Sequence, residues 1–173
     1  MAVAENKRYE RALAFATYKH EGQYRIGGQP YITHPIEVAH MVREKGYGID
    51  YQITALFHDL LEDTDATEDE IEELGGTNVR EAVVLLTKKE GYVMEKYVSA
   101  IKANKIAFPV KAADRLHNLR SADCTDEEFK RKYIIETVQW YLDFCPEIGK
   151  EVRRLAGLLK EPLKNIAFLY ESK

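Results

Sequence analysis

The sequence predicts an all-α fold of about nine or ten helices, arranged as a single helical bundle. Apolar residues recur at three- and four-residue spacing through most of the chain, and no stretch shows the alternation typical of a β-strand. Glycine, proline and capping residues divide this pattern into segments of helical length. A length of 173 residues corresponds to one ordinary domain. We therefore expect residues 1–173 to form one domain.

The first helix is expected over residues 5–20, where apolar side chains share one face and the pattern ends before Gly22. Residues 21–34 then break the periodicity with three glycines and a proline. A loop of this length often has a function. Two of its tyrosines, Tyr24 and Tyr31, are candidates for contact with a nucleobase.

Two helices are expected after this loop. Pro35 favours a helix start, because proline suits the first helical turn, and this helix should run to about Lys45. Asp50 is then the expected N-cap of a helix over residues 51–62. This second helix would carry a dense group of polar side chains at its end.

The rest of the chain contains two sequences with the pattern of a capping box, in which Thr67 precedes Glu70 and Thr125 precedes Glu128. The helices expected here cover residues 67–75, 77–88, 92–104, 109–122 and 126–143. Further helical turns should begin at Pro146 and Pro162, with the C-terminal helices of 146–173 belonging to the same domain.

The composition narrows the class of protein. With 45% hydrophobic residues the chain can build a core without disulfides, so Cys124 and Cys145 are expected to be reduced thiols in a cytoplasmic protein. No signal peptide and no apolar run of membrane-spanning length are expected. The net charge of −4 argues against nucleic acid as a partner, but it allows a small phosphorylated ligand. The oligomeric state is left open.

The stretch LFHDLLEDT, residues 56–64, places His58, Asp59, Glu62 and Asp63 among leucines. On a helix, Glu62 would share a face with His58, and Asp63 with Asp59. Two explanations are possible: a helix end that faces solvent, or a metal site. Exposure to solvent would explain Glu62 and Asp63. It explains His58 and Asp59 less well, because apolar residues flank these two on both sides.

Two more stretches of the sequence also contain polar side chains that could bind a metal ion or a ligand. In KAADRLHNLRS, Asp114, Asn118 and Ser121 recur at i, i+4 and i+7, and His34 stands at an expected helix start. Imidazoles and carboxylates together suit Mn²⁺, Fe²⁺ or Zn²⁺. Such an ion lowers the pKa of water and polarises a phosphoryl oxygen, so two histidines and two aspartates would form a hydrolytic centre. From the spacing of these residues alone, a metal site and purely structural roles for the four side chains are equally good explanations.

The order H…HD…D resembles that of the HD-domain phosphohydrolases, which are all-helical. The segments GQYRIGGQPYITHP, ALFHDLLEDT and ADRLHNLRS, in that order, closely resemble the hydrolase domain of the RelA/SpoT alarmone enzymes. The resemblance extends through AFATYKHEGQ and LLTKKEG and covers roughly residues 5–145. It implies hydrolysis of guanosine tetra- and pentaphosphate (ppGpp and pppGpp) to GDP or GTP and pyrophosphate, with Mn²⁺ as the cofactor.

The resemblance also implies roles for individual residues. The implied metal ligands are His34, His58, Asp59 and Asp114. The implied pair that orients or deprotonates the attacking water is Glu62 and Asp63. The implied substrate contacts come from Arg25, Asn118, Ser121 and Lys88. Three further histidines, His20, His40 and His117, are expected to be structural.

The chain departs from the family pattern in two ways. Ile26 stands where members often have a basic residue, so one phosphate contact could be missing. The sequence also ends without a synthetase domain, so we expect a stand-alone small hydrolase, similar to the animal SpoT homologue. Two alternatives stay open: a phosphatase for NADPH or an adenosine-based alarmone, and a catalytically silent nucleotide-binding module. Loss of a metal ligand, Glu62 or Asp63 would mark the silent module, and all of these residues are retained.

Overall fold

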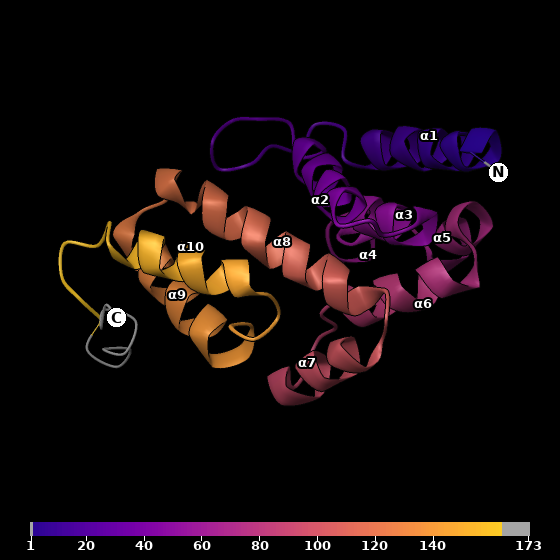
Figure 1. Ribbon diagram of the computed structural model, residues 1–173. Helices are drawn as coiled ribbons and strands as arrows, with labels where there is room; N and C mark the ends of the chain where they lie inside the picture. Colours follow the sequence, from indigo (N-terminus) through magenta and orange to yellow (C-terminus); the bar gives the residue numbers. More distant parts are fainter. Residues whose placement is uncertain (1, 164–173) are drawn as a thin grey trace. The chain divides into compact units, whose positions relative to one another are not determined.

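The computed structural model describes residues 2–163, and its regular secondary structure is helical (Figure 1). This part contains ten α-helices and one 3-10 helix and no strand, apart from an isolated bridge between Tyr24 and Pro30. The all-α prediction is confirmed. No helix among these residues has the length and apolar character to cross a membrane.

The chain divides into two units, residues 1–114 and 115–173. The helices of the first unit are α1 (Ala2–Lys19), α2 (Thr33–Glu44), α3 (Ile49–Phe57), α4 (Leu60–Asp63), α5 (Glu68–Gly75), α6 (Thr77–Leu86) and α7 (Met94–Ala103). Helix α8 (Ala107–Ser121) contains the boundary. The second unit continues with η1 (Ala122–Cys124), α9 (Glu127–Trp140) and α10 (Pro146–Ala156). That both units form one domain stays a prediction.

Helix α3 lies at the centre of the first unit. It contacts α1, α2, α5 and α6, and the side chains of its last five residues are fully buried: Ile53, Thr54, Ala55, Leu56 and Phe57. The Phe57 ring packs edge-on against Phe15 of α1, with centroids 5.7 Å apart. Burial of a side chain such as Leu56 or Phe57 stabilises the fold by roughly 1.5–3 kcal/mol. The end of α3 is therefore held firmly in the core, and it fixes the position of His58 and Asp59, which follow it.

The expected continuous helix over residues 51–62 is wrong, because it is interrupted at His58 and Asp59, between α3 and α4. The imidazole Nδ1 of His58 donates to the Ala55 carbonyl at 2.7 Å. In an uninterrupted α-helix that carbonyl would accept the N–H of Asp59. The side chain thus competes with the backbone at the position where the helix breaks.

Two predicted caps are also wrong. Helix α3 begins after Gly48, and Asp50 lies inside the first turn, where its carboxylate accepts a hydrogen bond from Arg8 at 2.9 Å. Helix α9 is capped by Asp126, which accepts from the Phe129 N–H, while the Thr125 hydroxyl donates to a carbonyl of η1. The observed caps are therefore Gly48, which has no side chain to cap the helix, and Asp126, the neighbour of the expected Thr125.

The capping box at Thr67 and Glu70 is confirmed, with both of its hydrogen bonds present at the start of α5. Several helices end earlier than expected; α6 stops at Leu86 and α9 at Trp140. The helix expected from Pro162 falls almost entirely outside the described residues. Both cysteines are free thiols.

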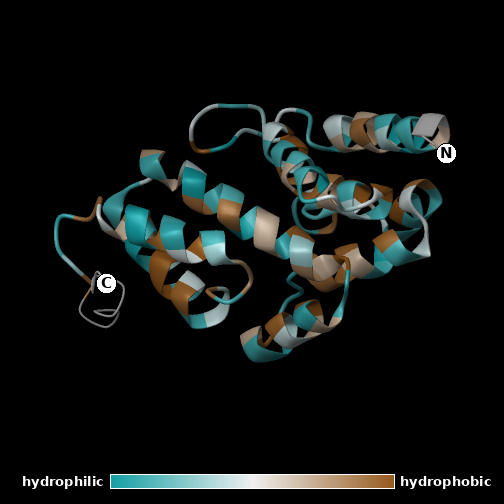
Figure 2. Ribbon diagram, viewed as in Figure 1, coloured by the Kyte–Doolittle hydropathy of each residue, from teal (hydrophilic) through white to brown (hydrophobic). Residues whose placement is uncertain are grey.

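The second unit is organised around α9 and α10, which contact each other. Figure 2 shows that both helices carry hydrophobic as well as hydrophilic residues. The buried guanidinium of Arg115 lies 4.3 and 4.0 Å from the ring centroids of Tyr133 and Tyr141, and it donates to Glu136 at 2.6 Å. Stacking on two rings and a charged partner together compensate for the burial of this cation.

Candidate metal centre

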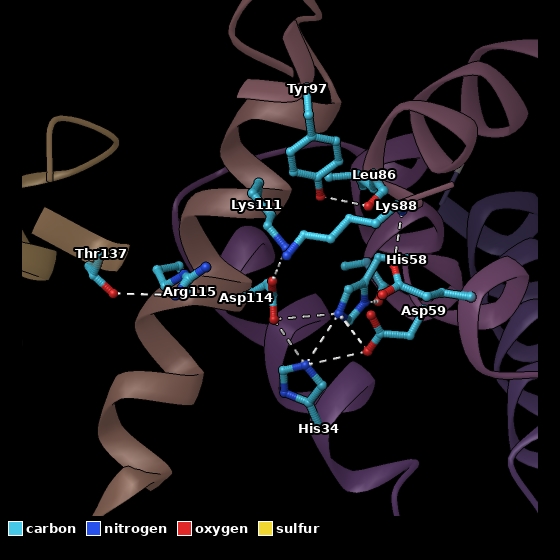
Figure 3. Close-up of polar contacts among 12 residues, drawn as sticks. His34, His58, Asp59, Leu86, Lys88, Tyr97, Lys111, Asp114, Arg115 and Thr137 are labelled. Carbon is cyan, nitrogen blue, oxygen red and sulfur yellow. Dashed lines mark hydrogen bonds and ion pairs between the residues drawn. The ribbon is translucent and has the colours of Figure 1, made fainter. Parts of the chain in front are cut away.

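Four side chains of the first unit converge from separate elements (Figure 3). His34 is the second residue of α2, His58 follows α3, Asp59 precedes α4, and Asp114 lies in α8. In Figure 3 the two imidazoles point toward each other and the two carboxylates point toward the imidazoles. The structure thus brings together all four residues that the sequence suggested as metal ligands.

The donor atoms lie close to one another. The Nε2 atoms of His34 and His58 are 3.2 Å apart. His34 Nε2 is 3.1 Å from Asp114 Oδ1, and His58 Nε2 is 3.0 Å from Asp59 Oδ2. The two crossed distances, from His34 to Asp59 and from His58 to Asp114, are 3.7 and 3.6 Å.

These separations fit one divalent ion. Imidazole nitrogen and carboxylate oxygen bind such ions at about 2.0–2.2 Å, which places neighbouring donors roughly 3.0–3.5 Å apart. The site is also enclosed, since the side chains of His34 and His58 are each 2% exposed, whereas that of Asp59 is 20% exposed. The donor set therefore suits a metal that is held in the interior and open on the side of Asp59.

The hydrogen bonding of His58 prepares it to be a ligand. Its Nδ1 faces the Ala55 carbonyl at 2.7 Å, so this nitrogen carries a proton and donates. In the neutral ring the other nitrogen, Nε2, then has a free electron pair. A backbone carbonyl on the remote nitrogen is a common device for orienting metal-binding histidines.

The pKa values of the two histidines shift in opposite directions, while that of Asp59 is lowered. Burial lowers the pKa of His34. Burial would also lower the pKa of His58, but the carboxylates of Asp59 and Asp114 raise it to about 10. Burial would raise the pKa of Asp59, yet His58 beside it holds that pKa below its ordinary value. The carboxylates of Asp59 and Asp114, both with lowered pKa values, stay ionised and provide the negative charge that a metal ion requires.

A lysine that the sequence reasoning missed is part of this arrangement. Lys111 donates from Nζ to Asp114 Oδ2 at 2.8 Å, and the two side chains are only 12% and 7% exposed. Asp114 therefore uses one oxygen for Lys111 and directs the other toward the histidines. The spacing of opposite charges at i and i+3 on a helix was a signal that could have identified this pair.

Loss of the lysine charge is expected to destabilise the metal-free protein. Removing one partner of a buried ion pair leaves the other charge uncompensated, at a cost of about 3–5 kcal/mol. Lys111→Met keeps the length of the side chain and should lower the free energy of unfolding in urea by about that amount. Lys105→Met, at an exposed position, is the control and should change it by less than about 0.5 kcal/mol. Equal effects of the two substitutions would contradict the assignment.

Tyr31 connects the cluster to the acidic pair. Its hydroxyl donates to Asp59 Oδ2 at 2.6 Å and lies 3.3 Å from Asp63 Oδ2. Its ring packs against His20 and His34, with centroid distances of 4.8 and 6.0 Å. Burial and the charge of Asp59 raise its pKa, so the phenol stays protonated. The Tyr31 hydroxyl therefore holds the Asp59 carboxylate in place. The contact between Tyr31 and a nucleobase, suggested by the sequence, stays a prediction.

The acids of the pair have different neighbours. Glu62 Oε2 accepts from the backbone N–H of Lys88 at 3.0 Å. Asp63 lies beside the Tyr31 hydroxyl, and partial burial together with the charges of Asp59 and Glu62 raises its pKa. The backbone carbonyl of Asp63 accepts from the Gln23 amide at 2.7 Å, which ties the acid to the loop after α1.

The remaining site residues suggested by the sequence lie in three places. Arg25 is in the loop between α1 and α2, where its backbone N–H donates to the Gln29 carbonyl at 2.9 Å. The Lys88 ammonium lies over the rings of Tyr92 and Tyr97, at 5.4 and 5.8 Å from their centroids. Asn118 and Ser121 follow Asp114 on α8, beyond the boundary of the first unit. Their contact with a substrate stays a prediction.

Comparison with known proteins identifies relatives for most of the chain. Residues 12–106 match the family described as "HD domain". The chain is 31% identical over 175 residues to a GTP pyrophosphokinase of Myxococcus xanthus, and 33% identical over 154 residues to the bifunctional (p)ppGpp synthase/hydrolase SpoT of Escherichia coli K12. These alignments cover 93% and 83% of this chain but 22% of each relative. The predicted resemblance to the RelA/SpoT enzymes is thereby confirmed.

A solved structure shares the fold. It belongs to a metazoan ortholog of SpoT described as hydrolysing ppGpp, and it matches with a TM-score of 0.67 at 23% sequence identity. The alignment covers 84% of this chain and 85% of the other. This likeness shows that the two chains share a helical fold.

Proposed function

The chain belongs to the HD-domain family, and from this premise we propose that it is a metal-dependent phosphohydrolase that removes the 3′-pyrophosphate from guanosine tetra- or pentaphosphate. The observation that carries the proposal is the convergence of two imidazoles and two carboxylates, beside a second pair of acids, in the first unit. The names of the relatives, which include a guanosine-3′,5′-bis(diphosphate) 3′-pyrophosphohydrolase of Escherichia coli O157:H7, support the choice of substrate.

The residues that would hold Mn²⁺ in the proposed reaction are His34, His58, Asp59 and Asp114. When bound, such an ion lowers the pKa of water and polarises a phosphoryl oxygen. Asp63 accepts a proton from the attacking water, and its raised pKa brings it nearer to the operating pH of a general base. Asp59 is held in place by the Tyr31 hydroxyl at 2.6 Å.

The substrate carries a pyrophosphate and is strongly anionic, so cations must offset the acids of the site. Arg25 and Lys88 are the proposed phosphate contacts, and an arginine can bind a phosphate through two parallel hydrogen bonds. Asn118 and Ser121 are the proposed hydrogen-bonding partners of the nucleotide. These assignments rest on the family resemblance.

Hydrolysis is expected to depend on added metal. Purified protein with Mn²⁺ should release pyrophosphate from guanosine tetraphosphate, and chelation with EDTA should reduce the rate to the level of the metal-free control. Readdition of Mn²⁺ should restore the rate, and Mg²⁺ or Zn²⁺ in parallel would test the choice of metal. Pyrophosphate release no faster than in the metal-free control would refute the proposal.

The presence of isoleucine at position 26 is a reason to test a second class of substrate. Its side chain is 70% exposed in the same loop as Arg25, at the position where the RelA/SpoT enzymes often have a basic residue. A missing phosphate contact there would favour NADPH or an adenosine-based alarmone over the guanosine substrates. Values of kcat/KM for guanosine tetraphosphate, guanosine pentaphosphate and NADPH, measured with Mn²⁺, would decide between them. Binding of all three without turnover would indicate the silent module.

A further inference from the structure

We infer that Glu62 and Asp63 have separate roles: Glu62 is a positioning residue for the Lys88 turn, residues 87–93, and Asp63 alone accepts the proton of the attacking water. The inference rests on the proposed hydrolase function and deepens it. It starts from the observation that the two neighbouring carboxylates contact different partners.

The Glu62 carboxylate is already engaged with the backbone. Its Oε2 accepts from the Lys88 N–H at 3.0 Å, across 26 residues of sequence. A backbone amide is too weak an acid to supply a proton in catalysis, so this bond holds two segments of the chain together. Because the acceptor is charged, this bond is stronger than one between neutral groups, and it fixes the start of the Lys88 turn.

The Lys88 turn has further contacts that make its position well defined. Thr87 closes the end of α6, since its N–H and its hydroxyl both reach the Val83 carbonyl. The Lys88 ammonium lies over the rings of Tyr92 and Tyr97. Tyr97 in turn donates from its hydroxyl to the Leu86 carbonyl at 2.7 Å (Figure 3). With Glu62 holding the amide, backbone and ammonium of Lys88 are both oriented.

Asp63 has the neighbours expected of the base. Its Oδ2 lies 3.3 Å from the Tyr31 oxygen, and that hydroxyl donates to Asp59 Oδ2 at 2.6 Å. The same Asp59 oxygen is 3.0 Å from His58 Nε2, so a single hydroxyl separates Asp63 from the donor cluster. Glu62 shows no such link among the contacts described for it.

The proton balance then requires one base. The water oxygen forms a bond to the phosphorus attached to the ribose 3′ oxygen, and one water proton passes to the Asp63 carboxylate. The bond between that phosphorus and the 3′ oxygen breaks, and the 3′ oxygen takes up a proton from Asp63 or from solvent. Pyrophosphate leaves, and Glu62 keeps its charge throughout.

The test compares Glu62→Gln, Glu62→Ala and Asp63→Asn in the full chain, with Mn²⁺ and guanosine tetraphosphate. A glutamine oxygen can still accept from the Lys88 N–H but cannot take up a proton. Glu62→Gln should therefore keep kcat within about threefold of wild type, whereas Asp63→Asn should lose about 10²–10⁴-fold. Glu62→Ala should raise KM about tenfold, with a smaller change in kcat, because the Lys88 turn loses its tether.

A second measurement needs neither metal nor substrate. Amide hydrogen exchange at Lys88, followed by NMR in the metal-free protein, should be about tenfold faster in Glu62→Ala and close to wild type in Glu62→Gln. Glu73→Ala, at an exposed position of α5, is the control and should leave both exchange and kinetics unchanged.

The outcomes separate the inference from the function on which it rests. If Glu62→Gln lost as much kcat as Asp63→Asn, Glu62 would take part in proton transfer and the division of roles would be wrong. Unchanged Lys88 exchange in Glu62→Ala would refute the positioning role by itself. If the wild-type protein released no pyrophosphate, the proposed function would fail, and with it the base role of Asp63, whatever the exchange data showed.

Discussion

Asp59→Ala should abolish both metal binding and hydrolysis. The Asp59 Oδ2 atom lies 3.0 Å from His58 Nε2 and 3.7 Å from His34 Nε2, so its removal opens one side of the proposed coordination shell. Since even residues that only orient metal ligands are worth 10- to 100-fold in affinity, loss of a ligand should lower Mn²⁺ affinity by more than about 100-fold. Titration calorimetry with Mn²⁺ and the rate of pyrophosphate release measure the two effects.

The matching control is Asp69→Ala, which removes an exposed carboxylate from the first turn of α5. It should leave Mn²⁺ affinity and rate unchanged apart from a small loss of stability. Circular dichroism establishes that the Asp59 variant is folded, so that lost activity can be assigned to the site. Retention of wild-type Mn²⁺ affinity by Asp59→Ala would show that Asp59 is not a metal ligand.

Asp63→Asn should keep metal affinity and lose turnover. Asparagine has nearly the same size and still presents an oxygen to the Tyr31 hydroxyl, but it cannot accept a proton. The rate kcat should fall by about 10²–10⁴-fold, the usual contribution of a general base, while the Mn²⁺ dissociation constant stays near that of wild type. If the metal were lost as well, Asp63 would belong to the coordination shell.

The pH dependence gives this variant a second readout. Partial burial and the charges of Asp59 and Glu62 raise the pKa of Asp63 in the folded protein. A base works in its deprotonated form, so kcat/KM of the wild type should fall as pH decreases through this raised pKa, at a higher pH than for an ordinary aspartate. In Asp63→Asn that acidic limb should be missing from the profile. A limb identical to that of wild type would mean that another group is titrating.

Part of this architecture could be predicted from local sequence. The capping box at Thr67 forms because its two hydrogen bonds link residues only three apart. The break in the expected helix over residues 51–62 could not be predicted in the same way, since His58 and Asp59 contact His34 of α2, which is more than 20 residues away in the sequence. Asp50 likewise is a good cap by residue type, but Arg8 of α1 engages its carboxylate.

The helical class, the residue types of the donor set and the resemblance that proposes their roles follow from the amino-acid sequence alone. They depend on periodicity, composition and motif order, which do not require knowledge of how the helices pack. Which atoms meet depends on the tertiary structure: Tyr31 meets Asp59, His34 meets Asp114, and Glu62 meets the amide of Lys88. A hydrogen bond or ion pair forms only when both groups are within about 3 Å, and for residues on separate segments of the chain that distance depends on how the helices pack.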